Sequence, residues 1–145
     1  MGKPRVMVAL ASADSVESLT TLACQLADGM DAEVSALHVV EVPLLTPLEA
    51  AEESLDHPGK ELLAQAKGVA ERFPRHLSTQ LLRAREVGEA IVGEAKEQGV
   101  ELLVMGHHQP RPHHLSETLL GGTVRYVAHH APCRVIVQIP APEHG

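Results

Sequence analysis

Short apolar runs alternate along the chain with segments whose apolar residues recur at helical spacing, and this alternation constrains the fold most strongly. A run that is apolar throughout is typical of a strand buried on both faces of a sheet. The predicted strands are 5–10, 33–40, 77–84, 100–105 and 134–139, and the predicted helices are 16–27, 60–73, 89–98 and 124–130. Because crossovers between parallel strands are right-handed, this order predicts an α/β fold. We expect a single doubly wound, five-stranded, mostly parallel sheet with helices on both faces.

Capping signals surround the first predicted helix. Either Ser12 or Asp14 can cap its start, and Glu17 stands three residues after Asp14, as in a capping box. Asp28, which is followed by a glycine, is expected to stop the same helix. The sequence therefore predicts a short polar turn between the first strand and this helix.

The length of 145 residues fits one domain with its own core. Residues 1–140 are expected to form this domain, and residues 141–145 are expected to be a loose C-terminal tail. Within the domain, residues 41–58 are predicted to be a loop with room for a short helix, and Pro74 is expected to close the second helix.

Composition excludes several classes of protein. The chain is 44% hydrophobic but has one Phe, one Tyr and no Trp, so the core must be aliphatic and no aromatic platform for single-stranded nucleic acid is expected. A net charge of -7 argues against a nucleic-acid-binding surface. Cys24 and Cys133 lie in apolar surroundings and predict two buried, reduced thiols. Without a long apolar run, the protein is expected to be cytoplasmic and not itself a membrane protein.

A glycine pattern near the C-terminus predicts a ligand site. The fourth predicted strand ends on Gly106, and Gly121, Gly122 and Thr123 stand at the start of the last helix. Ligands of parallel sheets bind beyond the carboxyl ends of the strands, and backbone N–H groups at a helix N-terminus bind phosphate. We therefore expect these two segments to converge, with unpaired amides directed at a common hollow.

Taken together in order, the segments 6–10, 36–40, 101–106 and 120–137 resemble the universal stress protein family over nearly the full length. The last segment is the most specific, because glycine, helix, Ala-Pro-Cys and an aliphatic strand follow one another at the family spacing. The resemblance implies an adenine-nucleotide-binding type of α/β fold, in which some members bind ATP or AMP and others bind no nucleotide. It also implies a homodimer formed by pairing of the last strands.

The resemblance implies a set of nucleotide-binding residues and also reveals departures from the motif of ATP-binding members. That motif reads Gly, two residues, Gly, nine residues, Gly, then Ser or Thr. Gln109 stands at the second glycine, and Ala11 stands where ATP binders carry an Asp directly after the first strand. The ATP motif is therefore partly degenerate. The implied contacts are Ala9, Val39 and Met105 on the adenine side and Gly106, Gly121, Gly122 and Thr123 on the phosphate side.

Two functions follow. The first is a regulatory dimer that senses an adenine nucleotide, ATP or AMP, with a cyclic dinucleotide or another anion as other occupants of the cleft. The second is a protein-interaction module that binds no nucleotide and acts on a partner such as a membrane transporter, as Ala11 and Gln109 favour. No Gly-x-Ser-x-Gly or His-Glu-x-x-His motif is present, so we do not expect an enzyme, although slow hydrolysis of a bound ATP stays open.

Histidines cluster in the last third of the chain, and two readings of them stay open. In the first, they bind a ligand, either a transition metal or, once protonated, an anion. In the second, they are solvated on the surface. Of these possibilities, we do not expect a metal site. The residues concerned are His107, His108, His113, His114, His129 and His130. His38 is expected to be a hydrogen-bonded core histidine. Arg83 and Arg85, at a strand end and a helix start, are expected to be solvated on the surface.

Overall fold

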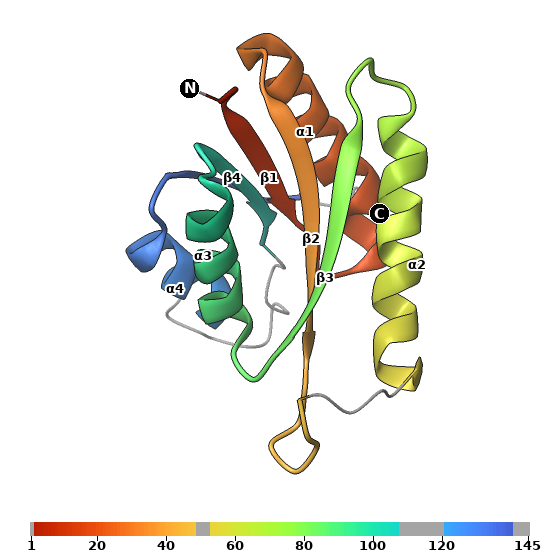
Figure 1. Cartoon of the computed structure of the whole chain (residues 1–145), viewed down its shortest axis with the longest axis vertical. Helices are drawn as coiled ribbons and strands as arrows, with labels where there is room; N and C mark the ends of the chain where they lie inside the picture. The colour runs from red at the N-terminus through yellow and green to blue at the C-terminus, as the bar shows by residue number, and fades with distance from the viewer. Residues whose placement is uncertain (1, 49–52, 108–120, 141–145) are drawn as a thin grey trace.

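The computed structural model describes residues 2–48, 53–107 and 121–140. These residues form one sheet covered by helices on both faces (Figure 1). The strands are β1 (Arg5–Ala9), β2 (Glu33–Glu41), β3 (Leu77–Ala84), β4 (Leu102–Gly106) and β5 (Arg134–Gln138). The helices are α1 (Val16–Met30), α2 (Glu53–Ala70), α3 (Val87–Gln98) and α4 (Gly122–His130), and a short 3-10 helix, η1 (Ala13–Ser15), precedes α1.

The sheet is parallel and doubly wound, as predicted. Its strands are ordered β3-β2-β1-β4-β5, and each neighbouring pair runs parallel. In the register, Val8 of β1 pairs with Ala36 of β2 on one side and with Val104 of β4 on the other. The chain leaves β1 in one direction and β4 in the other, so the switch point lies between these two strands. A crevice is expected beyond their carboxyl ends.

Two aliphatic layers form the core, one on each face of the sheet. Helices α1 and α2 cover one face, where Val8, Leu19 and Val104 are buried, and α3 and α4 cover the other, where Met7 and Leu103 are buried (Figure 1). Alternate residues of β1 and β4 point into opposite layers, which explains why these strands are apolar throughout. The predicted aliphatic core is therefore confirmed.

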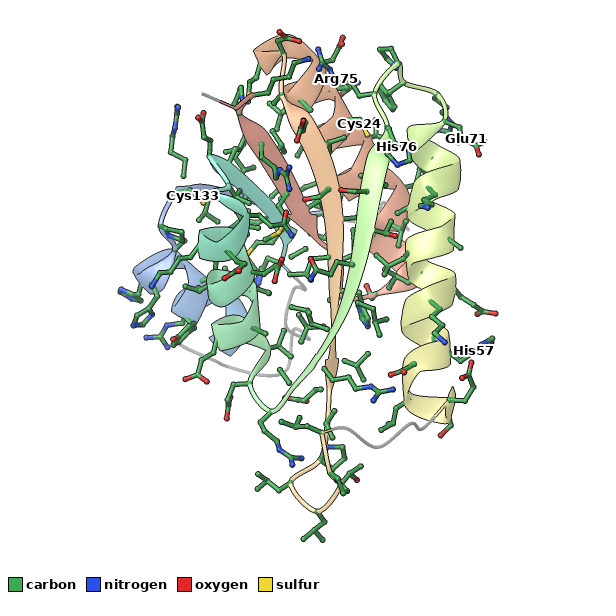
Figure 2. The ribbon with its side chains drawn as sticks, viewed as in Figure 1. Cys24, His57, Glu71, Arg75, His76 and Cys133 are labelled. Carbon is green, nitrogen blue, oxygen red and sulfur yellow. The ribbon has the colours of Figure 1, made fainter. Side chains whose placement is uncertain are left out.

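Helix α1 starts at Val16, as predicted, but its capping and its C-terminal end differ from the prediction. It continues past Asp28 to Met30 and ends at Asp31, which adopts a left-handed conformation with a φ of 52°. The Asp31 carboxylate accepts a hydrogen bond of 2.8 Å from Arg75, which lies at the end of the molecule where α1 ends (Figure 2). The predicted capping box is wrong, because Asp14 lies within η1 and neither Ser12 nor Ser15 makes a side-chain cap.

Helix α2 starts earlier and ends earlier than predicted. It begins at Glu53, within the segment predicted to be a loop, and contains Pro58. It ends at Ala70, four residues before Pro74, and the chain then turns into β3. Pro58 lacks a backbone N–H and so removes one hydrogen-bond donor from α2, but the helix continues through this residue.

Two arginines hold the connection between β2 and α2, so the prediction that they are solvated is wrong. Arg83 donates from Nε to the carboxylate of Asp56 at 3.0 Å and forms a second bond to it from Nη2. Arg85 donates to the backbone carbonyls of Val42, Pro43 and Thr46, the last at 2.7 Å. The loop is therefore fixed at its base, although Leu44 and Leu45 at its tip are exposed.

Both cysteines are free thiols in this structure. Cys24 is buried and Cys133 is half-buried, so the prediction of two buried thiols holds fully only for Cys24. Burial raises the pKa of each thiol above its usual value of 9.0, which keeps both protonated at neutral pH.

None of the described helices combines the length and the apolar composition that crossing a bilayer requires. The tail 141–145 lies outside the described residues.

Candidate functional site

A cavity of about 670 Å³ opens at the switch point of the sheet. Its described lining comes from the carboxyl ends of β1, β4 and β5, from β2, and from the beginnings of η1, α1, α3 and α4. This volume lies in the range of about 300–1,000 Å³ that is typical of small-molecule sites. The crevice that the topology predicts is therefore present and large enough for an organic ligand.

All seven residues that the sequence singled out line this one cavity. They are Ala9, Val39, Met105, Gly106, Gly121, Gly122 and Thr123. The carboxyl end of β4 and the start of α4 thus converge in space, although 15 positions separate Gly106 from Gly121 in the sequence. Their contact with a nucleotide stays a prediction, which the structure leaves open.

One side of the cavity is apolar. Ala9 and Met105 are paired neighbours on β1 and β4, and both are buried beside Val39. Ile91 of α3 and Val124 of α4 complete this side. A flat, uncharged ring can bury its faces here by the hydrophobic effect.

The opposite side is polar, and sequence reasoning had assigned none of its residues to a site. Ser12, Asp14, Ser15 and Ser18 come from η1 and the first turn of α1. Ser18 also accepts a hydrogen bond of 2.9 Å from the Gln138 side chain of β5. The signal for them in the sequence is the run of small polar residues directly after β1, which is equally typical of helix capping.

The start of α4 presents backbone donors to the cavity that have no acceptor among the described residues. The first helical hydrogen bond runs from the Arg125 amide to the Gly121 carbonyl, at 3.0 Å. The preceding amides, those of Gly122, Thr123 and Val124, therefore have no acceptor within the helix. No side chain caps this terminus and no acidic residue lies in its first turn. Such a terminus attracts an anion.

The amide that directly follows Gly106 is not free. The His107 backbone N–H donates to the Gln138 carbonyl at 2.9 Å, so the prediction of unpaired amides holds at α4 but is wrong at this position. Gly106 itself fits closely over α1, because a Cβ there would lie 3.0 Å from Cδ1 of Leu19. The glycine at this position therefore has a packing reason independent of any ligand.

Three other predictions concern histidines. The prediction for His38 holds in part: its Nδ1 donates to the Leu10 carbonyl at 2.7 Å, but the residue is half-buried and lines the cavity instead of lying in the core. His130 stacks on Tyr126 at the exposed end of α4, with ring centroids 4.1 Å apart. Within the described residues no group of three metal-ligating side chains occurs. His108, Gln109, His113 and His114 lie outside the described residues.

Comparison with known proteins gives a consistent result. A model of the universal stress protein family matches residues 4–138 of the chain. The solved universal stress protein UspA from Lactobacillus plantarum is 24% identical, with a TM-score of 0.73, over 94% of this chain and 98% of that chain. Comparison with curated proteins finds no match.

Two further solved structures contain a nucleotide. The universal stress protein from Archaeoglobus fulgidus in complex with dAMP is 20% identical, with a TM-score of 0.71, over 94% of this chain and 97% of that chain. A universal stress protein family protein from Arabidopsis thaliana with AMP bound is 17% identical, with a TM-score of 0.63, over 95% of this chain and 92% of that chain. At these identities, the likeness concerns the fold.

Proposed function

The chain belongs to the universal stress protein family, and we propose that it is a regulatory module that binds an adenine nucleotide, ATP or AMP, in the cleft between β1, β4 and α4. One observation carries the proposal. The seven residues implied by the family resemblance line a single cavity that has an apolar side and a helix N-terminus with free amides. Similar folds with dAMP and with AMP bound support the choice of ligand.

The two sides of the cleft suit the two parts of a nucleotide. The adenine ring would lie against Ala9, Val39 and Met105, where it loses contact with water. The phosphate would accept hydrogen bonds from the amides at the start of α4, which the helix dipole strengthens. Neither part requires a metal ion.

The module would sense the nucleotide rather than transform it. Catalysis of phosphate transfer or hydrolysis requires groups that position the nucleophile and stabilise developing charge. The described lining of the cavity contains no Lys or Arg. We therefore propose a binding function in the cytoplasm, without an enzymatic reaction.

A homodimer is the second part of the proposal. Strand β5 lies at an edge of the sheet, and its Val135, Ile136 and Val137 are only half-buried, with Ile139 56% exposed directly after it. An unpaired apolar edge strand favours association. Pairing of β5 with β5 of a second copy would cover this edge. Light scattering should then give twice the 15.5 kDa mass of the chain.

A protein-interaction module is the alternative function, acting for instance on a membrane transporter. Leu44 and Leu45, which are 84% and 99% exposed on a loop that Arg85 holds at its base, favour a surface contact with another protein. Ala11 in the cleft, in place of an acidic residue, also favours it.

Thermal unfolding in the presence of AMP or ATP separates the two functions. A ligand present at 100 times its dissociation constant adds about 2.7 kcal/mol to the free energy of unfolding. This should raise the unfolding temperature by about 2–8 °C in a domain of this size. Ribose 5-phosphate, which lacks the base, is the matched control and should have a much smaller effect. No shift with any adenine nucleotide would favour the interaction module.

A further inference from the structure

The cleft has an unequal distribution of charge around its rim. Three helices begin there, because Ser15, Val87 and Gly122 all line the cavity at helix starts. Each helix N-terminus carries a partial positive charge. Acidic residues in the first turn offset this charge in α1, through Glu17, and in α3, through Glu89. The first turn of α4 has none, so among the described residues no carboxylate in the first turn offsets the positive end of this helix.

A second observation points to a ligand at the same place. His107 is only 7% exposed and lines the cavity. Its backbone amide donates to the Gln138 carbonyl, but no hydrogen bond to its imidazole ring is found within the described part of the chain. Because no described residue bonds to this ring, its nitrogens are available to a ligand atom in the cavity. A neutral imidazole can donate one N–H to a phosphate oxygen.

The cleft also contains a feature that opposes high negative charge. Asp14 lines it, and no ion pair with a described cation neutralises its carboxylate. Neither Lys nor Arg occurs among the described lining residues, and the whole chain carries a net charge of -7. Among the described lining residues, the helix dipole and His107 are therefore the groups that can offset negative charge on a ligand, and they suit one phosphate better than three.

We propose that this cleft selects nucleotides by charge: His107 and the start of α4 bind a single phosphate group, and Asp14 disfavours the additional charges of a triphosphate. The inference rests on the proposed nucleotide function and narrows its ligand to a nucleoside monophosphate. His107 and Asp14 are the specificity-determining residues.

Calorimetry with adenosine, AMP and ATP, at one ionic strength and without divalent cations, tests the selection directly. AMP should bind more tightly than adenosine, because only AMP has the phosphate. ATP should bind at least about fivefold more weakly than AMP, because the Asp14 carboxylate repels the additional charges of the triphosphate. Equal or tighter binding of ATP would overturn the inference and leave the proposed function standing. Absence of binding by all three ligands would contradict the proposed function itself.

Two pairs of variants test whether Asp14 and His107 cause the selection of AMP. Asp14→Asn should bring the affinity for ATP closer to that for AMP by about fivefold and leave adenosine unchanged. Asp28→Asn is the matched control, because Asp28 lies near the opposite end of α1, pairs with Arg75 at 3.6 Å and does not line the cavity. This control should leave the ratio of the ATP and AMP affinities as it is. An equal effect of both substitutions on that ratio would overturn the role of Asp14.

His107→Leu should abolish much of the preference for AMP over adenosine, while His107→Gln, which keeps an N–H donor, should retain part of it. Circular dichroism establishes that each variant folds. If folded His107→Leu prefers AMP over adenosine as strongly as the wild type does, the role of His107 is overturned.

Discussion

Gly59 of α2 lies directly against the imidazole ring of His38 on β2. A Cβ at position 59 would stand 2.5 Å from Cδ2 of that ring and 2.7 Å from Cδ1 of Leu81. The other side of the ring is fixed by the hydrogen bond from Nδ1 to the Leu10 carbonyl. This close approach explains why α2 carries a glycine near Pro58, where neither residue favours a helix. It also fixes α2 against the sheet next to the cleft, which His38 lines.

Gly59→Ala should lower the free energy of unfolding by about 1–3 kcal/mol, because the added methyl group must displace His38 or Leu81. Gly68→Ala is the matched control in the same helix. Its Cβ would meet nothing within 4 Å, so it should stabilise the protein by about 0.5–1 kcal/mol through helix propensity. Urea titration measures both values. A Gly59→Ala variant as stable as Gly68→Ala would show that the contact is not tight.

The ion pair between Asp56 and Arg83 should make stability depend on pH in the acidic range. Hydrogen bonding to the Arg83 guanidinium lowers the pKa of Asp56 below its usual value of 3.8. The stabilisation is therefore fully present above pH 3.8 and is lost as the pH falls through the lower pKa of the folded state. Asp56→Asn should lower the unfolding temperature at neutral pH and weaken its dependence on acid.

Glu53→Gln is the control for that experiment. Glu53 pairs with Lys60 at 3.5 Å, but its side chain is 78% exposed, so its loss should have little effect. If Asp56→Asn and Glu53→Gln give the same unfolding temperature at every pH, the buried pair contributes no more than an exposed one.

Asp31 combines a left-handed backbone with an ion pair, and two substitutions separate these contributions. Asp31→Ala and Asp31→Gly both remove the bond to Arg75, but only glycine adopts a φ of 52° without strain. The glycine variant should therefore be more stable than the alanine variant by about 1–2 kcal/mol. Denaturant unfolding of both variants measures the difference. Equal stability would mean that the turn relaxes to another conformation.

The sequence predicted the sheet well because its strands are defined by local pattern. The apolar runs and their order were enough for the topology, and the bounds of β3 match the prediction at both ends. The ends of α1 and α2 depend on tertiary contacts. The bond from Arg75 to Asp31 lets α1 continue past Asp28, and the fit of Gly59 against His38 gives a reason for the Pro58 region to lie in a helix.

In the candidate site, too, some residues are recognisable from local sequence pattern and others only from tertiary structure. Glycines such as Gly106 and Gly121 stand out in the sequence, because a strand end and a helix start are local signals. Asp14 and Ser18 do not stand out as site residues, because they reach the cleft only when η1, α1 and β4 come together. His107 stands out only as one of six clustered histidines, for which the sequence leaves binding and solvation both open. Sequence pattern therefore predicted the position of the cleft, and the fold was needed to find its polar side.

The central claim is that backbone amides at the start of α4 bind the phosphate of a nucleotide, and position 122 tests it with a matched pair of variants. Gly122 is the first helical residue, where proline is well tolerated, and Gly121 before it has the extended conformation that a following proline requires. Gly122→Pro removes one amide donor, whereas Gly122→Ala keeps it and adds a methyl group that meets nothing within 4 Å.

Calorimetric titration of both variants with AMP is therefore the most direct measurement. Gly122→Ala should bind AMP about as tightly as the wild type, and Gly122→Pro should bind it about tenfold or more weakly, as expected for the loss of a hydrogen bond to a charged group. Equal affinities of the two folded variants for AMP would contradict the claim.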